Sequence, residues 1–221
     1  MSAIILFMYP GACSRVTMTA LEEIGIAYDD RCIDLGGGAQ SGADYLAINR
    51  KGKVPTLSVD GETLTENAAI LFYLSHRYPQ AALLPRSDDP LTAARGLSDL
   101  IWCASTLHPE VRQIRAPHKW TLTEPAGVHA DGLQKFAKEC KFISERVGER
   151  GWWYGQQWSI VDAYVSWAYS TAAKGGFPLT DYPRLLAHAE RLRARPSCQR
   201  ARARELAAID REKLAIDAAT L

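Results

Sequence analysis

The sequence predicts a small α/β domain followed by an all-helical domain. Up to about residue 80, short β-like runs alternate with short helical patterns in the order βαβαββα, which implies a mixed sheet with helices on its faces. Beyond residue 90, helical periodicity continues and no segment reads as a strand. All six tryptophans lie in this later part of the chain, as expected for an aromatic helical domain. We therefore divide the chain into domains at 1–80 and 90–221, with a linker at 81–89.

Local signals define the elements of the first domain. The apolar run 3–8 predicts a buried strand, and the pattern over 15–25 predicts a helix. This helix should end at Gly25, because glycine favours the left-handed conformation that follows many helix C-termini. The pair Asp60-Gly61 supplies the positive φ angles of a two-residue hairpin turn. The remaining elements are strands at 27–35, 55–59 and 62–65 and helices at 42–49 and 66–78.

The second domain begins after a proline-rich stretch. Three prolines fall within residues 79–90, and such a stretch interrupts regular structure and suits a linker. Further on, Ser159 and Asp162 have the spacing of a capping box, in which the serine caps a helix and the acidic residue reaches back to the serine N–H. This pair predicts a folding role rather than a catalytic one. The predicted helices cover 90–112, 126–148, 159–174 and 183–194.

Charge and hydropathy exclude several classes of protein. The formal net charge of +1 gives no long-range field that would attract nucleic acid or anionic lipid. No segment approaches the roughly 20 apolar residues that cross a bilayer, and the first ten residues read as a strand rather than a signal peptide. We therefore expect no nucleic-acid partner and no membrane partner. A basic cluster with helical spacing predicts a solvated face and comprises Arg191, Arg193, Arg195, Arg200, Arg202 and Arg204.

The cysteines do not form a disulfide or zinc pattern. There are five of them, widely spaced and without a CxxC pair, which fits a reducing cytoplasm. The five histidines show no metal-ligand spacing either. We therefore expect a cytoplasmic protein without a metal, in which four of the cysteines are ordinary core residues. These four are Cys32, Cys103, Cys140 and Cys198.

Cys13 is the cysteine with a distinctive position. It follows a Pro-Gly-Ala turn at the end of the first strand and precedes the first helix. A helix N-terminus exposes unpaired N–H groups and about half a positive charge, so a thiolate there is stabilised and its pKa falls. Ser14 offers a hydroxyl to the same anion. The alternative is a small buried hydrophobe, and Val16 leaves Cys13 without a second thiol three residues on.

Two further features suit a small peptide-like thiol. Val54-Pro55 stands just before the third strand, where a cis bond would leave the backbone of Val54 able to pair with an extended peptide. Glu66 and Asn67 begin a helix, so a polar side chain and N–H groups are available to a carboxylate. The alternative for this second feature is plain helix capping by Thr65 or Glu66.

Together these segments resemble the cytosolic glutathione transferases, most closely their bacterial, beta-like branch. The motifs YPGACS, YLAINRKGKVPTL, LTENAAILFYL and SIVDAY occur in the order and at the spacing of that family, and the resemblance covers nearly the whole chain. It implies the glutathione transferase fold, with a thioredoxin-like N-terminal domain and an all-helical C-terminal domain. It also implies a homodimer and glutathione as co-substrate.

The resemblance implies roles for individual residues of the first domain. Cys13 matches the cysteine that faces the glutathione sulfur, and the backbone of Val54 matches the one that pairs with the cysteinyl part. Ser or Gly is commoner than Asn at position 67, although Asn67 can still donate to a carboxylate. The glutathione-binding residues implied are Lys53, Val54, Pro55, Glu66 and Asn67.

The resemblance extends into the second domain. His108 matches a histidine carried towards the active site, which completes a catalytic set of Cys13, Ser14 and His108. The family often has lysine where this chain has Pro109, which would bend the helix. A lysine of the second-strand loop is replaced by the glycines 36–38, so modest glutathione affinity is expected.

These features leave three functions open. The first is conjugation of glutathione to a small hydrophobic or aromatic electrophile, or thiol-driven removal of a group from it, as in detoxification. The second is glutathione-dependent reduction of a disulfide or of dehydroascorbate through a mixed disulfide at Cys13. The third is non-catalytic binding of hydrophobic ligands. Candidate walls of the acceptor pocket, for each of which core packing is the alternative, are Trp102, Arg112, Arg115 and Tyr164.

Overall fold

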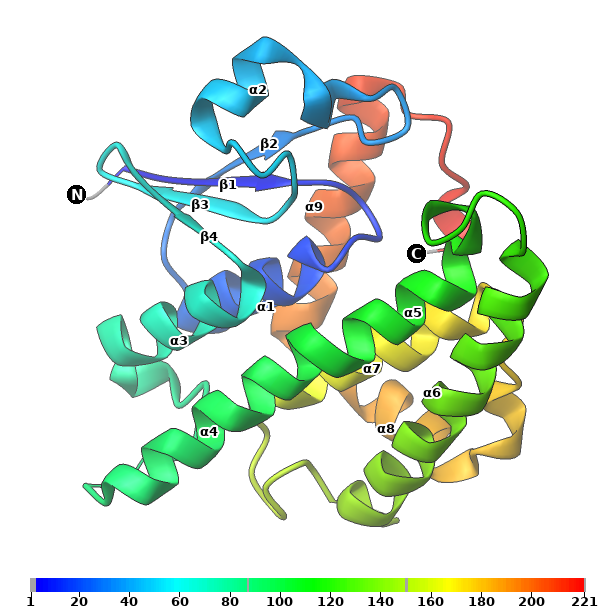
Figure 1. Cartoon of the computed structure of the whole chain (residues 1–221). Helices are drawn as coiled ribbons and strands as arrows, with labels where there is room; N and C mark the ends of the chain where they lie inside the picture. The colour runs from blue at the N-terminus through cyan, green and yellow to red at the C-terminus, as the bar shows by residue number, and fades with distance from the viewer. Residues whose placement is uncertain (1–2, 87, 150, 221) are drawn as a thin grey trace. The chain divides into compact units, whose positions relative to one another are not determined.

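The computed structural model describes residues 3–86, 88–149 and 151–220. Contacts group the chain into two compact units, one made of Met1–Ala81 together with Arg195–Leu221, the other of Ala82–Ala194. The sequence analysis placed residues 195–221 in the helical domain, whereas contacts group them with the N-terminal unit. Figure 1 shows the course of the chain through both units.

The N-terminal unit contains a mixed four-stranded sheet of the thioredoxin-like type, as the sequence predicts. The strand order is β2-β1-β3-β4, with β1 parallel to β2 and antiparallel to β3, and β3 antiparallel to β4. Helices α1 and α3 pack together on one face, and Figure 1 shows α2 across the other face. The elements are β1 (Ile4–Met8), α1 (Ser14–Ile24), β2 (Asp29–Cys32), α2 (Ala43–Ile48), β3 (Thr56–Val59), β4 (Glu62–Thr65) and α3 (Asn67–Arg77).

Strand β1 lies in the core of this sheet. Leu6 and Met8 have no exposed surface, and Leu6 is paired with the equally buried Leu57 of β3. On the α2 face, the ring of Phe7 lies 5.8 Å from that of Tyr45. A strand covered on both faces is apolar at successive positions rather than alternate ones, which explains the continuous run in the sequence.

The turns predicted from glycine are confirmed. Gly25 follows α1 with φ 76°, and its N–H donates to the Leu21 carbonyl. Asp60 and Gly61 have φ values of 52° and 91° between β3 and β4, as a two-residue hairpin turn requires.

The second unit is helical, as the sequence predicts. Helix α7 is buried along most of its length, and other helices of the unit pack against it. Short isolated bridges near Trp152 and Tyr154 provide its extended pairing within the described residues. The elements are α4 (Pro90–Trp102), a π-helical turn (Cys103–Leu107), α5 (His108–Arg115), α6 (Pro125–Val147), α7 (Ile160–Ala173) and α8 (Pro183–Arg193).

The π-helical turn accommodates the proline next to His108. The His108 N–H donates to the Cys103 carbonyl, five residues back, and Pro109 stands in the first turn of α5. Leu107 and His108 both have right-handed helical angles, so Pro109 lies inside a continuous run of helix, where the π-turn interrupts the i→i−4 ladder that a proline would otherwise break. The irregularity expected from Pro109 therefore takes the form of a π-turn just before it. Such turns often lie at functional sites.

The predicted capping box is confirmed and belongs to a larger buried network. The Asp162 carboxylate accepts from the Ser159 N–H at 2.8 Å and from its hydroxyl at 2.9 Å. The same carboxylate accepts from the Trp153 N–H at 2.6 Å and interacts with His188 Nε2 at 2.9 Å. Tyr169 contacts the other ring nitrogen of His188 at 2.8 Å. Asp162 thus joins the start of α7 to the preceding loop and to α8.

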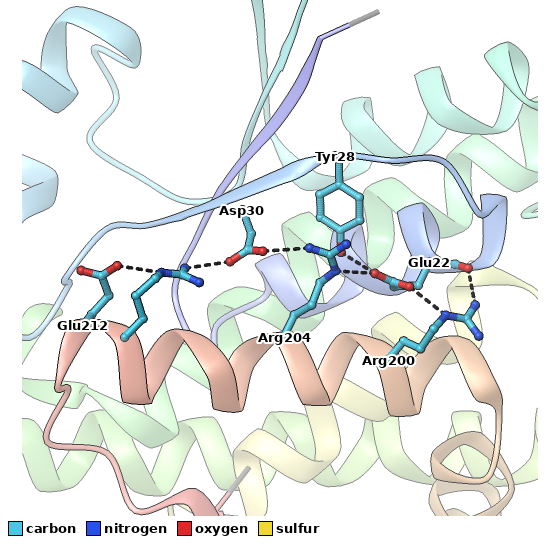
Figure 2. Close-up of polar contacts among 7 residues, drawn as sticks. Glu22, Tyr28, Asp30, Arg200, Arg204 and Glu212 are labelled. Atoms are coloured by element: carbon cyan, nitrogen blue, oxygen red, sulfur yellow. Dashed lines mark hydrogen bonds and ion pairs between the residues drawn. The ribbon is translucent and has the colours of Figure 1, made fainter. Parts of the chain in front are cut away.

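Helix α9 (Pro196–Glu212) packs against α1 of the N-terminal unit. Arg200 and Arg204 both pair with Glu22, and Arg204 and Arg211 both pair with Asp30 (Figure 2). The basic face is exposed as predicted, at 53% for the Arg200 side chain and 36% for that of Arg204. The sequence did not predict their ion pairs, because the carboxylate partners lie far away in the sequence.

The arginine pairs of α9 surround a buried tyrosine. The guanidinium of Arg204 stacks 4.1 Å from the ring centre of Tyr28, whose hydroxyl donates to Glu22 at 2.9 Å. Burial raises the pKa of Glu22, but hydrogen bonds from Arg200, Tyr28 and Arg204 outweigh this and hold that pKa below its ordinary value. The carboxylate therefore stays ionised and anchors α9.

None of the helices in the described ranges combines the length and the apolar character needed to cross a membrane.

Candidate functional site

Cys13 lies at the strand-to-helix junction that the sequence predicts. It immediately precedes α1, and 6% of its surface is exposed. Its Sγ lies 3.6 Å from the carbonyl oxygen of Val54, so the thiol can donate a weak hydrogen bond there. The Val54-Pro55 peptide bond is cis, which confirms the expectation for this bend. The thiol therefore faces the backbone that precedes β3.

The hydroxyl of Ser14 is engaged within the turn that leads into α1. Its Oγ donates to the Tyr9 carbonyl and accepts from the Tyr9 N–H, both at 3.2 Å. Ser14 has no exposed surface. A contact with the glutathione sulfur would require the hydroxyl to leave Tyr9, so that role of Ser14 stays a prediction.

Helix α9 holds the same turn from a second direction. Glu205 has no exposed surface and accepts from the Gly11 N–H at 2.9 Å and from Arg15 Nε at 2.6 Å. Gly11 has φ 78°, a conformation that glycine adopts without steric cost. Sequence reasoning missed Glu205, because 194 positions separate it from Gly11.

The start of α3 is the place where donors to a glutamyl carboxylate are predicted. Glu66 precedes the helix with φ 71°, in a region that residues other than glycine rarely occupy and that recurs at ligand sites. Its exposed carboxylate pairs with Lys51 Nζ at 2.7 Å. The N–H groups of the first turn of α3 are suited to a carboxylate. Lys51 adds a cation that sequence reasoning did not single out, although it stands two residues before Lys53.

The Asn67 side chain is turned into the protein. Its Nδ2 donates to the Cys13 carbonyl at 3.1 Å, and its Oδ1 accepts from the Thr17 hydroxyl at 2.6 Å. Asn67 is 5% exposed and Thr17 is fully buried. The amide expected to face a glutathione carboxylate instead joins the N-termini of α1 and α3.

Buried polar side chains fix the backbone just before the cis bond. The Lys53 carbonyl accepts from the Tyr45 hydroxyl at 2.7 Å and from Asn49 Nδ2 at 2.8 Å, while the Lys53 side chain is exposed. Thr56 Oγ1 contacts the same two groups, at 3.0 and 2.8 Å. Burial raises the pKa of Tyr45, so the phenol stays protonated and able to donate. Val54 and Pro55 are thereby presented on a fixed scaffold.

The other four cysteines are poor nucleophiles. Burial is the main cause that raises the pKa of Cys32 and of Cys198 to about 11. Burial also raises the pKa of Cys103 and of Cys140. At neutral pH these thiols are protonated, as their core or half-buried positions imply.

Two predicted residues of the second unit pack on one tryptophan. The His108 ring lies edge-on to Trp167 with centres 4.7 Å apart, and Tyr164, which is fully buried, lies 5.9 Å from Trp167. His108 is half-buried at the start of α5. Their roles in catalysis and acceptor binding stay predictions.

The other predicted acceptor residues are placed differently. Trp102 stacks on Trp153 at 5.2 Å between ring centres and donates from Nε1 to Glu139 at 3.2 Å, which is core packing of the kind weighed as the alternative. Arg112 is exposed on α5. Arg115 is also exposed and donates to the Lys174 carbonyl at 2.8 Å.

The groups gathered at this site are a thiol, backbone groups and a helix N-terminus. In the parts of the chain that the structure describes, no three histidine, cysteine or acidic side chains are grouped to hold a metal ion. Cys13, the Val54 backbone and the start of α3 together offer a thiol, an extended pairing edge and carboxylate donors. The resemblance predicts that these groups bind the sulfur, backbone and glutamyl end of glutathione, and these roles stay predictions.

Comparisons with known proteins agree with this geometry. The family model for the glutathione S-transferase N-terminal domain matches residues 2–76. Maleylacetoacetate isomerase of Pseudomonas aeruginosa is 31% identical over 200 residues, covering 87% of this chain and 92% of that protein. A bacterial beta class glutathione S-transferase of Sphingomonas chungbukensis is 32% identical, with a TM-score of 0.79, and the match covers 91% of this chain and 98% of that one. A sphingomonad glutathione S-transferase complexed with glutathione is 30% identical, with a TM-score of 0.80 and the same coverage. The chain therefore belongs to the glutathione transferase family, as a bacterial beta-class-like enzyme with glutathione as its co-substrate.

Proposed function

We propose that this glutathione transferase joins glutathione to small hydrophobic or aromatic electrophiles, or uses it to displace a group from them. The observation that supports this most directly is the position of the Cys13 thiol beside the Val54 carbonyl, at the N-terminus of α1. Glutathione laid along the Val54 backbone would bring its own sulfur to Cys13, with its glutamyl carboxylate at the start of α3. Cys13 is the catalytic residue in this arrangement.

The chemistry that follows is a nucleophilic substitution or addition. Glutathione loses its thiol proton to solvent, and the thiolate attacks an electrophilic carbon, so that an S–C bond forms. In substitution, the leaving group departs with the bonding electron pair. The protein contributes by stabilising the thiolate and by holding two reactants together, which can remove several kcal/mol of the barrier. His108, Arg112, Arg115 and Tyr164 of the second unit stay the predicted residues of the acceptor side, whereas Trp102 packs on Trp153 and is not proposed for it.

A second candidate reaction is glutathione-dependent isomerisation. It is favoured by the 31% identity to a maleylacetoacetate isomerase over most of both chains. In such a reaction the thiolate adds to a conjugated double bond, the carbon–carbon bond rotates, and the same thiolate leaves. The residues required at the sulfur are those required for conjugation, so the electrophile alone distinguishes the two reactions.

A third candidate is disulfide reduction through Cys13. The Cys13 thiolate would attack a mixed disulfide of glutathione and release the substrate thiol. A second glutathione would then free Cys13 as oxidised glutathione forms. The position of Cys13 at a helix N-terminus is compatible with this route too, and it differs from conjugation in needing the Cys13 sulfur itself.

Replacement of Cys13 tests these alternatives. In Cys13→Ala, we expect turnover of a panel of aryl halides and of maleylacetone to fall at least about tenfold, because the sulfur contact is lost, and we expect disulfide exchange to cease. Turnover is measured with and without glutathione. Cys32→Ala is the matched control, since that thiol is half-buried with a pKa of about 11.

Each outcome of this experiment has a distinct meaning. Full activity of Cys13→Ala in every assay would contradict a role for the thiol. Lost conjugation with intact disulfide exchange would contradict the reductive route. Wild-type protein that turns over none of the electrophiles but binds hydrophobic dyes at micromolar concentration would favour the non-catalytic function.

We also infer a homodimer that works in the cytoplasm and removes toxic electrophiles. The resemblance to the family supports this inference. Light scattering after size exclusion should give twice the chain mass of 24.4 kDa. A single-chain mass at micromolar concentration would contradict the dimer.

A further inference from the structure

We propose that Asn67 and Thr17 form a positioning brace that fixes the Cys13 turn and couples it to the start of α3. The inference rests on the proposed function, because it assigns Cys13 and the α3 N-terminus to opposite ends of one glutathione molecule. Neither residue need touch the reacting sulfur. They would act through the backbone of Cys13.

The brace is a short chain of hydrogen bonds between two helices. The Thr17 hydroxyl, in the first turns of α1, donates to Asn67 Oδ1 at 2.6 Å, and Asn67 Nδ2 donates to the Cys13 carbonyl at 3.1 Å. The Cys13 carbonyl also accepts from the Val16 N–H at 3.0 Å. The carbonyl held by the brace thus belongs to the same residue that carries the thiol.

The orientation of the Asn67 amide follows from its partners. A backbone carbonyl can only accept, so the group that faces Cys13 must be the amide nitrogen. The oxygen then faces Thr17, whose hydroxyl can donate. The reversed amide would place two oxygens together and leave a buried polar pair unsatisfied. The arrangement is therefore fixed in one sense, and it depends on the hydroxyl at position 17.

Burial makes these bonds effective as a positioning device. Thr17 has no exposed surface and Asn67 is 5% exposed, so water competes poorly for their polar groups. Loss of the brace would let the first turn of α1 move, and with it the Cys13 sulfur relative to the Val54 carbonyl, 3.6 Å away, and relative to the helix N-terminus, whose dipole favours an anion. The expected consequence is a less reactive thiol in a protein that still folds.

The brace also connects the sulfur end of the site to the glutamyl end. Asn67 is the first residue of α3 and follows Glu66, which has φ 71°. The Asn67 side chain is hydrogen-bonded to Thr17 and to the Cys13 carbonyl. In this proposal the backbone N–H of Asn67 is therefore the group that would donate to a glutamyl carboxylate. One residue would thereby set the spacing of two subsites that bind the same ligand.

Three substitutions at position 17 or nearby isolate the brace. Thr17→Val removes the hydroxyl and keeps the shape, whereas Thr17→Ser keeps the hydroxyl and should rescue the effect. Thr19→Val is the matched control, because the Thr19 hydroxyl donates to the Arg15 carbonyl of its own helix at 2.9 Å and is buried to a similar degree. Asn67→Ser and the double variant Thr17→Val/Asn67→Ser complete the set.

Two readouts are needed on the full-length protein. The first is the rate of Cys13 carbamidomethylation by iodoacetamide from pH 5 to 9 without glutathione, followed by peptide mass spectrometry. The second is kcat and KM for glutathione with an aryl halide. For Thr17→Val we expect both the alkylation rate at pH 7 and kcat to fall about fivefold, the factor equivalent to about 1 kcal/mol for one hydrogen bond. The KM for glutathione should change by less than about twofold, because Thr17 does not contact it.

The pH profile separates positioning from a merely structural role. Alkylation of Thr17→Val should reach its midpoint at higher pH than wild type, while Thr17→Ser and Thr19→Val should follow wild type. The double variant should match Asn67→Ser alone, because residues of one hydrogen-bond network are not additive. The proposal is overturned if Thr17→Val behaves like Thr19→Val, or if the two single effects multiply.

The test remains decisive if one variant or the parent function fails. If Thr17→Val does not fold, Asn67→Ser replaces it as the variant without the brace, and Thr17→Ser remains the variant that keeps the hydroxyl. Should wild type turn over no electrophile, the proposed function falls, yet the alkylation profiles still decide whether the brace positions Cys13.

Discussion

Asp162→Ala is expected to destabilise the helical unit by about 3–5 kcal/mol, the usual cost of removing one partner from a buried charged network. The carboxylate is fully buried and is the acceptor for the Ser159 N–H and hydroxyl and for the Trp153 N–H. It also holds His188 at 2.9 Å. Alanine would leave these groups without their acceptor in a site that water cannot readily enter.

Tryptophan fluorescence is a direct probe of this loss. All six tryptophans of the chain lie within Ala82–Ala194, so urea unfolding followed at that signal reports on the helical unit and not on the other one. The control is Ser159→Ala, which removes the capping hydroxyl alone and should cost about 1 kcal/mol. If Asp162→Ala were no less stable than Ser159→Ala, the carboxylate would not be the centre of the network.

The parts of the fold that depend on neighbouring residues were predictable from the sequence. Gly25 and the Asp60-Gly61 pair act through their own backbone angles, and the capping box joins Ser159 and Asp162 across three positions. Such signals are complete within a few residues, because the atoms that interact are held near one another by the chain. The sheet and the helices follow from them and from apolar periodicity.

Contacts between distant segments were not predictable in this way. The helical spacing of the C-terminal arginines is visible in the sequence, but their partners Glu22 and Asp30 are more than 170 positions away. When the partners of a charged helix cannot be identified from the sequence, the pattern predicts a solvated helix and not its ion pairs. The same limit applies to Asn67, whose side chain turns to Thr17, 50 positions earlier, instead of to the ligand.

Glu205→Ala is expected to destabilise the N-terminal unit by about 3 kcal/mol and to slow alkylation of Cys13. Glu205 has no exposed surface, and its carboxylate accepts from the Gly11 N–H and from Arg15 Nε. Its loss would leave the Arg15 guanidinium, which is 23% exposed, without its carboxylate. Both partners flank Cys13, so the damage would fall on the turn that carries the thiol.

The measurement combines urea unfolding by far-UV circular dichroism with hydrogen exchange of residues 9–15. Asp210→Ala is the matched control, because Asp210 is an exposed acidic residue of the same helix. Glu205→Gln should be intermediate, since its amide oxygen can still accept from Gly11 while the charge opposite Arg15 is lost. If Glu205→Ala left exchange in this turn unchanged, α9 would stabilise the unit without acting on the thiol. Faster exchange would mean that a helix 194 positions downstream of Gly11 is part of the apparatus that fixes Cys13.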